Sequence, residues 1–302
     1  MSRTFDQLLA KGISLLPLSL RRHKLVKLLM FLRPSFRIQE VRFNGDCRLI
    51  ADLMDKNARN IFLKQSFEPE FIAVAKPFLA RGGIMFDIGA NFGFCSFGLL
   101  GALPQTDLEL HLFEACPALC ELLRQSAALH PRRRMVVNCG CVTDHAGTSH
   151  FESQEENRGD GHVTAGGLAE VKNLVLDDYL RAHHIPKVAF TKIDVEGHEV
   201  CVLRGARDSL TEGRLEAIYF EVANDTWSRQ GFTFQDGFAL LRHRGYQLFF
   251  CKSRDLARHP RGYVLKINGF DLPVAEVGST PFPDNYRSDL LAIHSSAACL
   301  GH

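Results

Sequence analysis

From residue 82 onward, short apolar segments alternate with longer segments of helical periodicity, and this pattern constrains the fold more than any other feature of the chain. Short strands separated by helices are typical of βαβ units and a parallel sheet. The chain is therefore predicted to have an α/β fold with a mostly parallel, doubly wound sheet. The expected strands are 83–90, 108–114, 135–142, 188–196, 215–223 and 246–251, and the expected helices are 92–103, 117–130, 198–210 and 234–245. Residues 281–294 are expected to add a last strand, antiparallel at an edge or beside the final pair.

The composition is that of an ordinary globular protein. Of the 302 residues, 46% are hydrophobic, and 36 Lys and Arg nearly balance 34 Asp and Glu. These values exclude a disordered or collagen-like chain, and a net charge of +2 removes the electrostatic signature of a dedicated nucleic-acid-binding protein. The length allows two small domains or one large domain with an appendage. We expect an N-terminal extension at 1–67 and a main domain at 68–302.

The N-terminal extension contains a segment from Leu20 to Leu32 in which apolar residues recur at helical spacing with basic residues between them. Pro17 and the basic residues 21–24 interrupt this region before it reaches the length of a membrane span, so we predict no transmembrane segment and a cytoplasmic protein. The pattern favours an amphipathic helix packed on the domain, and it also fits weak association with an anionic membrane surface. A turn signal at residues 44–46 predicts a hairpin after this helix.

Nine cysteines are spread along the chain, several of them within apolar segments. Their odd number and their positions predict reduced, buried thiols. The closest pairs, Cys116 with Cys120 and Cys139 with Cys141, lack the CxxC spacing of zinc sites, so we predict no metal cluster. Residues 153–167 are rich in Gly and charge and have no apolar periodicity, which predicts a loop.

The turn after the first strand of the main domain is glycine-rich and lies where doubly wound sheets bind ligands. Gly89 and Gly93 permit tight turning and close approach of the backbone to a ligand. A dinucleotide-binding turn requires Gly-x-Gly-x-x-Gly, and here Asn91 stands at the second glycine position and Phe94 at the third. The turn therefore argues against a nicotinamide cofactor.

Two carboxylates indicate a different cofactor. Asp87 would repel a pyrophosphate and attract the cationic amino acid end of S-adenosylmethionine. Glu114 ends the next strand, where a carboxylate can accept hydrogen bonds from both ribose hydroxyls. Taken alone, Glu114 can equally stabilise the start of the helix that follows it. Taken with the turn, it predicts an S-adenosylmethionine site that comprises Asp87, Gly89, Asn91, Gly93 and Glu114.

Acidic residues gather at the ends of the fourth and fifth strands. Lys192, Asp194 and Glu196 alternate with apolar residues, so we expect their side chains on one face of the strand. Carboxylates held close together raise one pKa, as a general base for a hydroxyl requires. The alternative is structural: Lys192 pairs with Asp194 or Glu196, and Glu199 stabilises the helix start. Two further titratable residues are expected at this edge of the sheet, His198 at the start of the next helix and Glu221 at the end of the fifth strand.

Several segments between residues 68 and 293 carry a resemblance to a known family: MFDIGANFGFCSF, LFEACPAL, VLDDYL, FTKIDVEGHEVCVLRGA and IYFEVA. The chain resembles the FkbM-type methyltransferases that depend on S-adenosylmethionine. The resemblance implies a class I methyltransferase (Rossmann-like) sheet, a small-molecule or glycan acceptor, and O-methylation of hydroxyls on sugars or natural products. It also implies that the cofactor is bound by Asp87, Gly89, Asn91, Gly93 and Glu114. The chain departs from the family pattern at residues 115–117 and at His198, and these departures bear on the substrate.

For a hydroxyl acceptor, the candidates for the general base are Asp194, Glu196, His198 and Glu221. A divalent ion held by Asp194 and Glu221 would be another way to lower the pKa of the hydroxyl. We expect acceptor choice to depend on the first 70 residues and on segment 153–167, with its Arg158, Asp160 and His162.

Two other functions stay open at this point. A nicotinamide-dependent oxidoreductase on a Rossmann-like fold would need the missing glycine, and a non-catalytic scaffold that binds a partner through the basic N-terminal helix would have no need of Asp87 and Glu114. Methylation of nucleic-acid bases is disfavoured, because no Asp-Pro-Pro-aromatic turn follows the fourth strand. Trp227 and Phe232 are too few for an aromatic platform.

Overall fold

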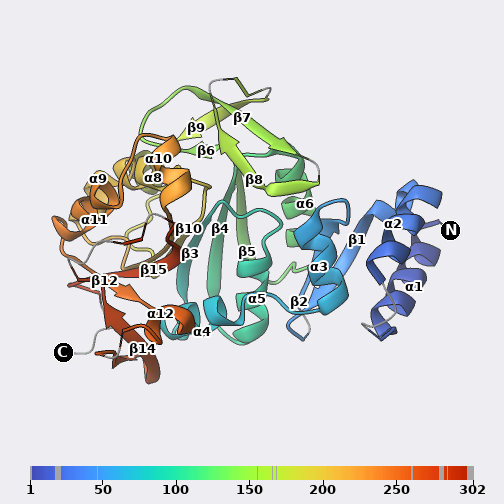
Figure 1. Ribbon diagram of the computed structural model, residues 1–302, viewed down its shortest axis with the longest axis horizontal. Coiled ribbons are helices and arrows are strands. Elements are labelled where there is room, and N and C mark those ends of the chain that lie inside the picture. The colour runs from blue at the N-terminus through green and yellow to red at the C-terminus, as the bar shows by residue number, and fades with distance from the viewer. Residues whose placement is uncertain are drawn as a thin grey trace.

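The computed structural model describes residues 2–17, 22–45, 47–154, 156–164, 166–167, 169–259, 261–278, 282–283 and 285–297. A nine-stranded sheet forms the centre of this part of the chain (Figure 1). In spatial order its strands are β13 (Tyr263–Ile267), β14 (Phe270–Glu276), β12 (Tyr246–Phe250), β15 (Arg287–His294), β11 (Ala217–Ala223), β10 (Phe190–Ile193), β3 (Gly83–Ile88), β4 (Leu108–Glu114) and β5 (Arg134–Cys139).

The five strands from β11 to β5 are parallel, as predicted. The chain builds outward from β3 to β5 and then returns to the other side of β3 at β10, so the winding reverses between β3 and β10. β15 runs antiparallel between β11 and β12, beside the final pair. The predicted α/β fold with a mostly parallel, doubly wound sheet is confirmed. The carboxyl ends of β3, β4 and β10 are therefore the place to look for a ligand.

Helices cover both faces of the sheet, because successive side chains of a strand point to opposite faces. On β3, Met85 belongs to one buried cluster, and Phe86 and Ile88 belong to the other. The first cluster includes α4 (Pro69–Leu79), α5 (Phe94–Ala102) and α6 (Pro117–Ala128). The second includes α7 (Leu176–Ala182), α8 (Glu199–Arg204), α9 (Arg207–Thr211), α10 (Asn224–Arg229), α11 (Phe234–Arg242) and α12 (Ser253–Leu256).

Two predicted elements are shorter than expected. The helix predicted at 198–210 is divided into α8 and α9 at Gly205, where a Cβ would lie 2.1 Å from the carbonyl oxygen of Thr143. The strand predicted at 188–196 ends at Ile193. Glu196 has a φ of 52°, in the left-handed region, so the expected alternation of Lys192, Asp194 and Glu196 along one strand face was wrong.

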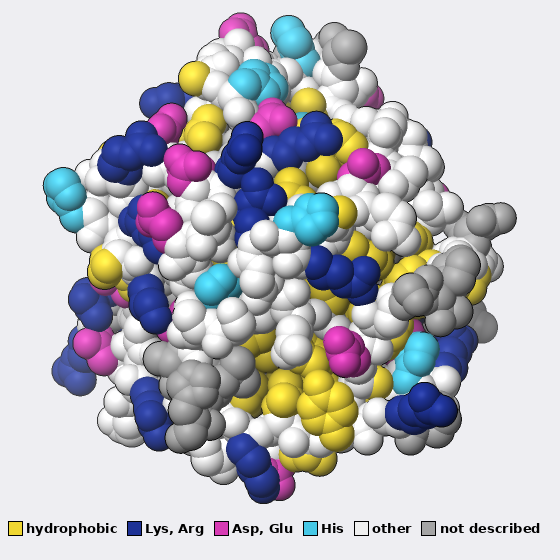
Figure 2. Space-filling view, turned by 90° about the vertical axis from the view of Figure 1, so that its left-hand side faces the viewer, with side chains coloured by type: hydrophobic (Ala, Val, Ile, Leu, Met, Phe, Trp, Pro, Cys, Tyr) yellow, Lys and Arg dark blue, Asp and Glu magenta, His cyan; other side chains and the backbone are white. Residues whose placement is uncertain are grey.

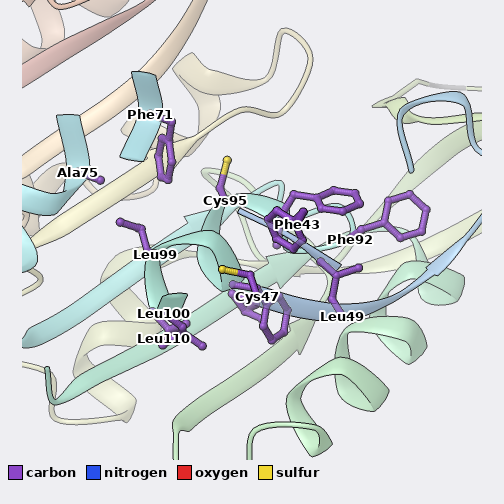
Figure 3. Close-up of a cluster of buried hydrophobic side chains, with 14 of the residues drawn as sticks. Phe43, Cys47, Leu49, Phe71, Ala75, Phe92, Cys95, Leu99, Leu100 and Leu110 are labelled. Atoms are coloured by element: carbon purple, nitrogen blue, oxygen red, sulfur yellow. The ribbon is translucent and has the colours of Figure 1, made fainter. Parts of the chain in front are cut away.

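The N-terminal extension packs on the first cluster. It comprises α1 (Ser2–Leu15), α2 (Arg22–Leu32), a 3-10 helix (Pro34–Arg37), the hairpin β1 (Ile38–Phe43) and β2 (Cys47–Asp52), and α3 (Lys56–Lys64). The predicted hairpin and the helix within 20–32 are confirmed, while Leu20, Arg21 and Asp46 lie outside the described residues. In Figure 3, Phe43 and Leu49 of the hairpin lie in one apolar cluster with side chains of α4 and α5. No helix among the described residues combines the length and apolar character that crossing a bilayer requires.

Segment 153–167 is not the predicted loop. β7 (Thr148–Gln154) and β8 (Asn157–Val163) form an antiparallel hairpin, and β7 also pairs with β9 (Ala169–Leu174), next to β6 (Cys141–Val142). The prediction failed because these strands form a separate four-stranded sheet whose strand β7 is largely exposed, so they need no alternation of apolar residues. The backbone N–H of Arg158 donates a hydrogen bond to Oδ2 of Asp55, which stands directly before α3. This bond ties the hairpin to the N-terminal extension.

The prediction that all cysteines are reduced was also wrong. Cys120 on α6 and Cys139 at the end of β5 form a disulfide, whereas Cys47, Cys95, Cys116, Cys141, Cys201 and Cys251 are free thiols. Cys299 lies outside the described residues. The sequence spacing of these two cysteines matches no motif, because strand pairing brings them together. Cys139 lies opposite Glu114 of the neighbouring strand β4, and α6, which carries Cys120, begins three residues after Glu114.

The surface carries charges of both signs. Figure 2, which looks at the side on the left of Figure 1, shows Lys and Arg interspersed with Asp and Glu, and an apolar area in its lower half. On this face, side chains of both charges are intermixed.

Candidate active site

A cavity of about 350 Å³ opens at the carboxyl ends of β3, β4 and β10, where the winding of the sheet reverses. Its size lies within the range of small-molecule sites. The residues that line it come from the turn after β3, from the ends of β4 and β10, from β6 and from the β7–β8 hairpin. Asn57 and Phe67 of the N-terminal part line it as well, and neither residue was predicted for the site.

The glycine turn is fixed between the two neighbouring strands. The N–H groups of Gly89 and Ala90 donate to the carbonyl of Phe113, and the N–H of Asp194 donates to the carbonyl of Ile88. Gly89 has a φ of 76°, and a Cβ there would lie 1.8 Å from the carbonyl oxygen of Asp194. Glycine is therefore required at this position, because the backbone of residue 89 passes too close to the backbone of Asp194 to leave room for a side chain.

Of the predicted cofactor residues in this turn, Gly89 and Asn91 line the cavity. The side-chain oxygen Oδ1 of Asn91 is buried and has no hydrogen-bond partner among the described residues. Gly93 is not among the lining residues. It precedes α5 with a φ of 84°, and a Cβ there would lie 2.6 Å from the ring of Phe97, so its role is to start the helix.

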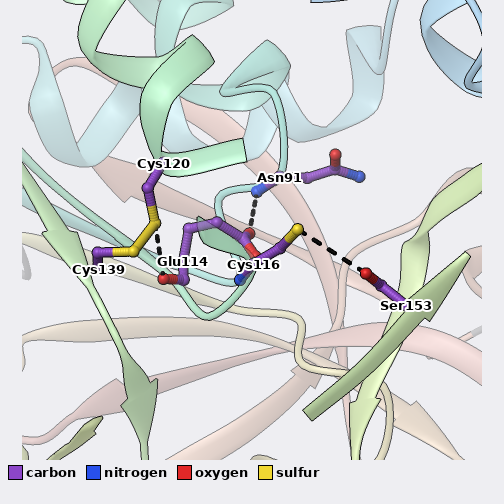
Figure 4. Close-up of a disulfide and its surroundings, with 6 residues drawn as sticks. All are labelled: Asn91, Glu114, Cys116, Cys120, Cys139 and Ser153. Atoms are coloured by element: carbon purple, nitrogen blue, oxygen red, sulfur yellow. Dashed lines mark hydrogen bonds between the residues drawn. A yellow bond between two sulfur atoms is a disulfide. The ribbon is translucent and has the colours of Figure 1, made fainter. Parts of the chain in front are cut away.

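Glu114 lies at the cavity wall with its carboxylate held in a fixed position. Oε2 accepts a hydrogen bond from the N–H of Asn91 at 2.7 Å, and Oε1 accepts one from the N–H of Cys116 at 2.8 Å (Figure 4). Burial raises the pKa of Glu114, and these two N–H groups oppose that shift. Each oxygen uses one lone pair on the backbone and keeps one for a ligand hydroxyl.

Asp87 is not among the residues that line the cavity, and its contact with the cofactor stays a prediction. Its side chain is fully buried, with Ser96 Oγ donating to Oδ2 at 2.6 Å and Lys192 Nζ lying 3.5 Å from Oδ1. Burial raises the pKa of Asp87, and Lys192 and Ser96 oppose the shift. The residue at the cavity wall is Lys192, whose ammonium also lies 3.1 Å from Asp194. The pairing of Lys192 with Asp194, given above as the structural alternative, is therefore present.

Three acids gather on the other side of β3 from Glu114. Carboxylate oxygens of Asp194, Glu196 and Glu221 lie within 4.8 Å of one another. Arg287, at the start of β15, lies 3.6 Å from Glu196 and 3.6 Å from Glu221. Such a cluster can share a proton or, as the sequence indicated, offer oxygen ligands to a divalent ion.

Within this cluster, Glu221 has a raised pKa. Burial, followed by the negative charges of Asp194 and Glu196, raises the pKa of Glu221 to about 9, and Arg287 only partly offsets this. Oε2 of Glu221 is buried without a hydrogen-bond partner among the described residues. Clustered carboxylates were expected to raise the pKa of one member, and in the structure that member is Glu221.

His198 and Glu199 are placed differently from the three acids. His198 lines the cavity but bonds through Nε2 to Thr143 Oγ1 at 3.0 Å, and burial lowers its pKa. Glu199 is fully buried, and its Oε1 accepts hydrogen bonds from the N–H groups of Val195 and Gly197, so it shapes the loop before α8. Burial raises the pKa of Glu199 to about 7.

Two further cavities adjoin the acid cluster. One, of about 350 Å³, lies between the β7–β8 hairpin and α10 and is lined by His162, Glu196 and Arg229. The other, of about 260 Å³, is lined by Asp194, Glu221 and Lys252. Arg287 lines both. Arg287 and Lys252 were missed from the sequence, since their place depends on β15 entering between β11 and β12.

Part of the chain is similar to known proteins in sequence. The family described as Methyltransferase FkbM domain matches residues 87–248. Hexuronic acid methyltransferase AglP of Haloferax volcanii is 24% identical over 127 residues, which are 42% of this chain and 51% of the relative. The chain thus spans about half the length of this curated relative.

Solved structures were matched as well. Methyltransferase FkbM from Methylobacillus flagellatus KT aligns with 65% of this chain and 44% of its own, at 16% identity and a TM-score of 0.39. The O-methyltransferase from Bacillus cereus in complex with SAH aligns with 74% of this chain and 79% of its own, at 10% identity and a TM-score of 0.34.

Proposed function

The chain belongs to the family of methyltransferases with an FkbM domain, and on that premise we propose that it transfers a methyl group from S-adenosylmethionine to an oxygen atom of a sugar, sugar acid or related small molecule. The observation that carries the proposal is the pairing of two features at the sheet reversal: Glu114 at the wall of a nucleoside-sized cavity, and three clustered acids on the other side of β3. In this proposal, Glu114 binds the cofactor, and one of the clustered acids accepts the proton of the acceptor hydroxyl.

The residues at the cavity fit this cofactor. Glu114 has free lone pairs for ribose hydroxyls, Asn91 has an unpartnered buried oxygen, and Gly89 brings the backbone close to the cavity. When bound, S-adenosylmethionine supplies a methyl group on a sulfonium, which is already a good leaving group. The chain therefore has to align the acceptor oxygen and remove its proton.

The acid cluster supplies the base in this proposal. Asp194 is held by Lys192 and is 39% exposed, so it can accept a hydrogen bond from an acceptor in the adjoining cavity. Glu221 holds a proton up to about pH 9 and lies in the same cluster, so it can take up the hydroxyl proton only after losing its own.

The acceptor is proposed to be a carbohydrate, and sugar acids are included. Acidic and basic side chains alternate around the two adjoining cavities, which suits the many donors and acceptors of a sugar. Arg287 and Lys252 offer partners to a carboxylate. The name of the relative AglP, a hexuronic acid methyltransferase, supports the same class.

The test uses S-adenosylmethionine with a labelled methyl group and three acceptors: an oligosaccharide that contains hexuronic acid, the matched oligosaccharide with a neutral hexose, and RNA. We expect label on carbohydrate and none on RNA. Alkali treatment then separates methyl esters, which release the label, from methyl ethers, which keep it. Label on RNA alone, or on none of the three while the cofactor binds, would overturn the proposed acceptor class.

Helix α2 supports a second proposal, weak association with an anionic membrane surface. Lys24, Lys27, Leu28 and Phe31 are spaced so that they share one face of the helix, and Phe31 is 83% exposed and Leu28 52%. Asp6, the acidic residue of α1, is buried against Arg33 and Ser35. Apolar side chains beside lysines fit a negatively charged bilayer, whereas a second copy of the chain would bring the lysines of both copies together.

Vesicle sedimentation tests this association with the full chain. We expect binding to vesicles of phosphatidylcholine and phosphatidylserine, none to phosphatidylcholine alone, and loss of binding in Leu28→Ser/Phe31→Ser. Tyr263→Ser/Val264→Ser, at exposed apolar positions of β13, is the matched control and should bind as the unaltered chain does. Equal sedimentation of both variants would contradict the membrane proposal.

A further inference from the structure

Asp194 stands at the boundary between the main cavity and the β11 cavity, which is the cavity of about 260 Å³ that Glu221 and Lys252 also line. The residues that line both cavities are Phe67, Glu68, Cys95, Lys192 and Asp194. The described lining of the other adjoining cavity, beside α10, does not include Asp194. With a cofactor in the main cavity, an acceptor oxygen at Asp194 therefore leaves the rest of the acceptor in the β11 cavity.

Tyr219 of β11 forms part of the wall of the β11 cavity, next to this boundary. It lies two residues before Glu221 on the same strand, so the two side chains are on one face of the sheet. Lys192, which lines both cavities, is the register partner of Tyr219 on β10. The ring of Tyr219 is packed edge to face against Phe71, with 5.3 Å between the ring centroids, and the residue is 3% exposed. Packing thus fixes the position of its hydroxyl.

The hydroxyl of Tyr219 has no hydrogen-bond partner among the described residues. It is not among the unpartnered polar atoms that are fully enclosed, so it keeps an exposed surface, and the cavity that Tyr219 lines supplies it. Burial, followed by the negative charge of Asp289, raises the pKa of Tyr219, so the hydroxyl keeps its proton and can donate it in a hydrogen bond. Tyr246 on β12 is also 3% exposed, but its hydroxyl donates to the carbonyl of Leu215 at 2.6 Å. The fold therefore satisfies one of these two buried hydroxyls and leaves the other to a ligand.

The wall of the β11 cavity has an aromatic part and a charged part. Phe67 and Phe71 supply the aromatic part, together with the ring of Tyr219. Lys252 and Asp289, which form an ion pair, belong to the charged part. A sugar ring carries apolar C–H groups on its faces and hydroxyls around its edge, so it matches a wall of this composition.

We propose that the Tyr219 hydroxyl donates a hydrogen bond to an oxygen of the acceptor sugar and so holds a neighbouring hydroxyl of that sugar at Asp194; this inference rests on the proposed function. Tyr219 is then a specificity residue for the acceptor. It keeps its own proton throughout, while the proton of the methylated hydroxyl passes to Asp194. An acceptor oxygen that loses this partner is left unpaired in a largely enclosed cavity, which weakens binding of the acceptor and not of the cofactor.

Tyr219→Phe tests the inference, because it removes the hydroxyl and keeps the packed ring. The acceptor is whichever of the two oligosaccharides, the one with hexuronic acid or its neutral counterpart, takes up more label from the unaltered chain. We expect KM for this oligosaccharide to rise about tenfold and the affinity for S-adenosylhomocysteine to stay within about twofold. The melting temperature of the unliganded variant should not fall, since the fold loses no hydrogen bond.

Tyr246→Phe is the matched control with the opposite pattern. It loses the bond to Leu215, so its melting temperature should fall, while KM for the oligosaccharide should not change. An unchanged KM in Tyr219→Phe would overturn the inference alone. An equal loss of affinity for S-adenosylhomocysteine, or a fall in melting temperature as large as that of Tyr246→Phe, would do the same, because either would assign the hydroxyl to the cofactor site or to the fold. If the unaltered chain binds S-adenosylhomocysteine and labels neither oligosaccharide, the proposed function is wrong, and the inference with it.

Discussion

The ammonium of Lys192 lies 3.1 Å from Asp194 and stands between the cavity and the fully buried Asp87. Burial lowers the pKa of Lys192, but the carboxylates of Asp194 and Asp87 outweigh this effect and raise it well above its ordinary value. Lys192 thus pairs with two carboxylates at the end of β10, and its pairing with Asp194 is the structural alternative given in the sequence analysis. A buried charge without its partner is costly, and this gives the arrangement a measurable consequence.

Lys192→Met should reduce the free energy of unfolding by about 3–5 kcal/mol, because it leaves Asp87 buried without its cation. The double variant Lys192→Met/Asp87→Asn should recover part of the loss, since it removes the unpaired charge. Chemical denaturation measures both. Lys187→Met, at a lysine that is 50% exposed in its pair with Glu216, should change stability by less than about 1 kcal/mol. A similarly small effect for Lys192→Met would show that the buried pair does not stabilise the fold.

Asp194→Asn should abolish methyl transfer while the affinity for S-adenosylhomocysteine changes little. The amide keeps the shape of the side chain but loses the charge that accepts the acceptor proton. Initial rates with a labelled methyl donor, measured beside calorimetric binding, separate the two effects. Glu212→Gln, at an exposed acid outside the three cavities, serves as the control. Unchanged turnover would remove Asp194 from the mechanism.

Glu221 should make the protein less stable as the pH rises. The folded chain holds the Glu221 proton up to about pH 9, whereas the unfolded chain releases it near 4.5. The folded state therefore binds more protons in between, and the stabilisation present below pH 4.5 is lost as the pH rises through 9. Glu221→Gln cannot ionise, so its melting temperature should fall less than that of the unaltered chain over this range. If the melting temperatures of the two proteins fell equally with rising pH, Glu221 would not be the group responsible.

The disulfide between Cys120 and Cys139 should stabilise the folded chain by about 3 kcal/mol, because it closes a loop of 19 residues in the unfolded state. Dithiothreitol should therefore lower the denaturation midpoint of the unaltered chain. Cys120→Ser/Cys139→Ser should show the lowered midpoint from the start and should not respond to the reductant. Equal midpoints of the oxidised and reduced chain would contradict this.

The sequence was sufficient for the parts of the fold that depend on local periodicity. The strands that became β3, β4, β11 and β12 are short, mostly apolar segments, as strands covered on both faces favour. The hairpin β7–β8 was missed because its strands are not packed against a large core, so their sequence carries no such pattern. Periodicity reports burial, and it says little about strands that are exposed.

The candidate site was predictable in its residue types and less so in its geometry. Glu114 was placed at the correct strand end, because strand ends follow from the pattern. The burial of Asp87 behind Lys192 depends on the register that sets Lys192 opposite Asp87, and a single sequence does not give that register. Arg287 lies 66 residues after Glu221 and reaches the acids only through antiparallel insertion of β15. The disulfide depends on tertiary contact in the same way.

Calorimetric titration with S-adenosylhomocysteine tests most directly whether the cavity beside Glu114 binds the nucleoside of S-adenosylmethionine. We predict binding to the unaltered chain, no binding of NAD, and a loss of at least about tenfold in Glu114→Gln, where an amide N–H group would face the backbone donors of Asn91 or Cys116. Glu121→Gln, at an exposed acid on α6, should bind normally. Absence of S-adenosylhomocysteine binding, or tighter binding of NAD, would contradict the account.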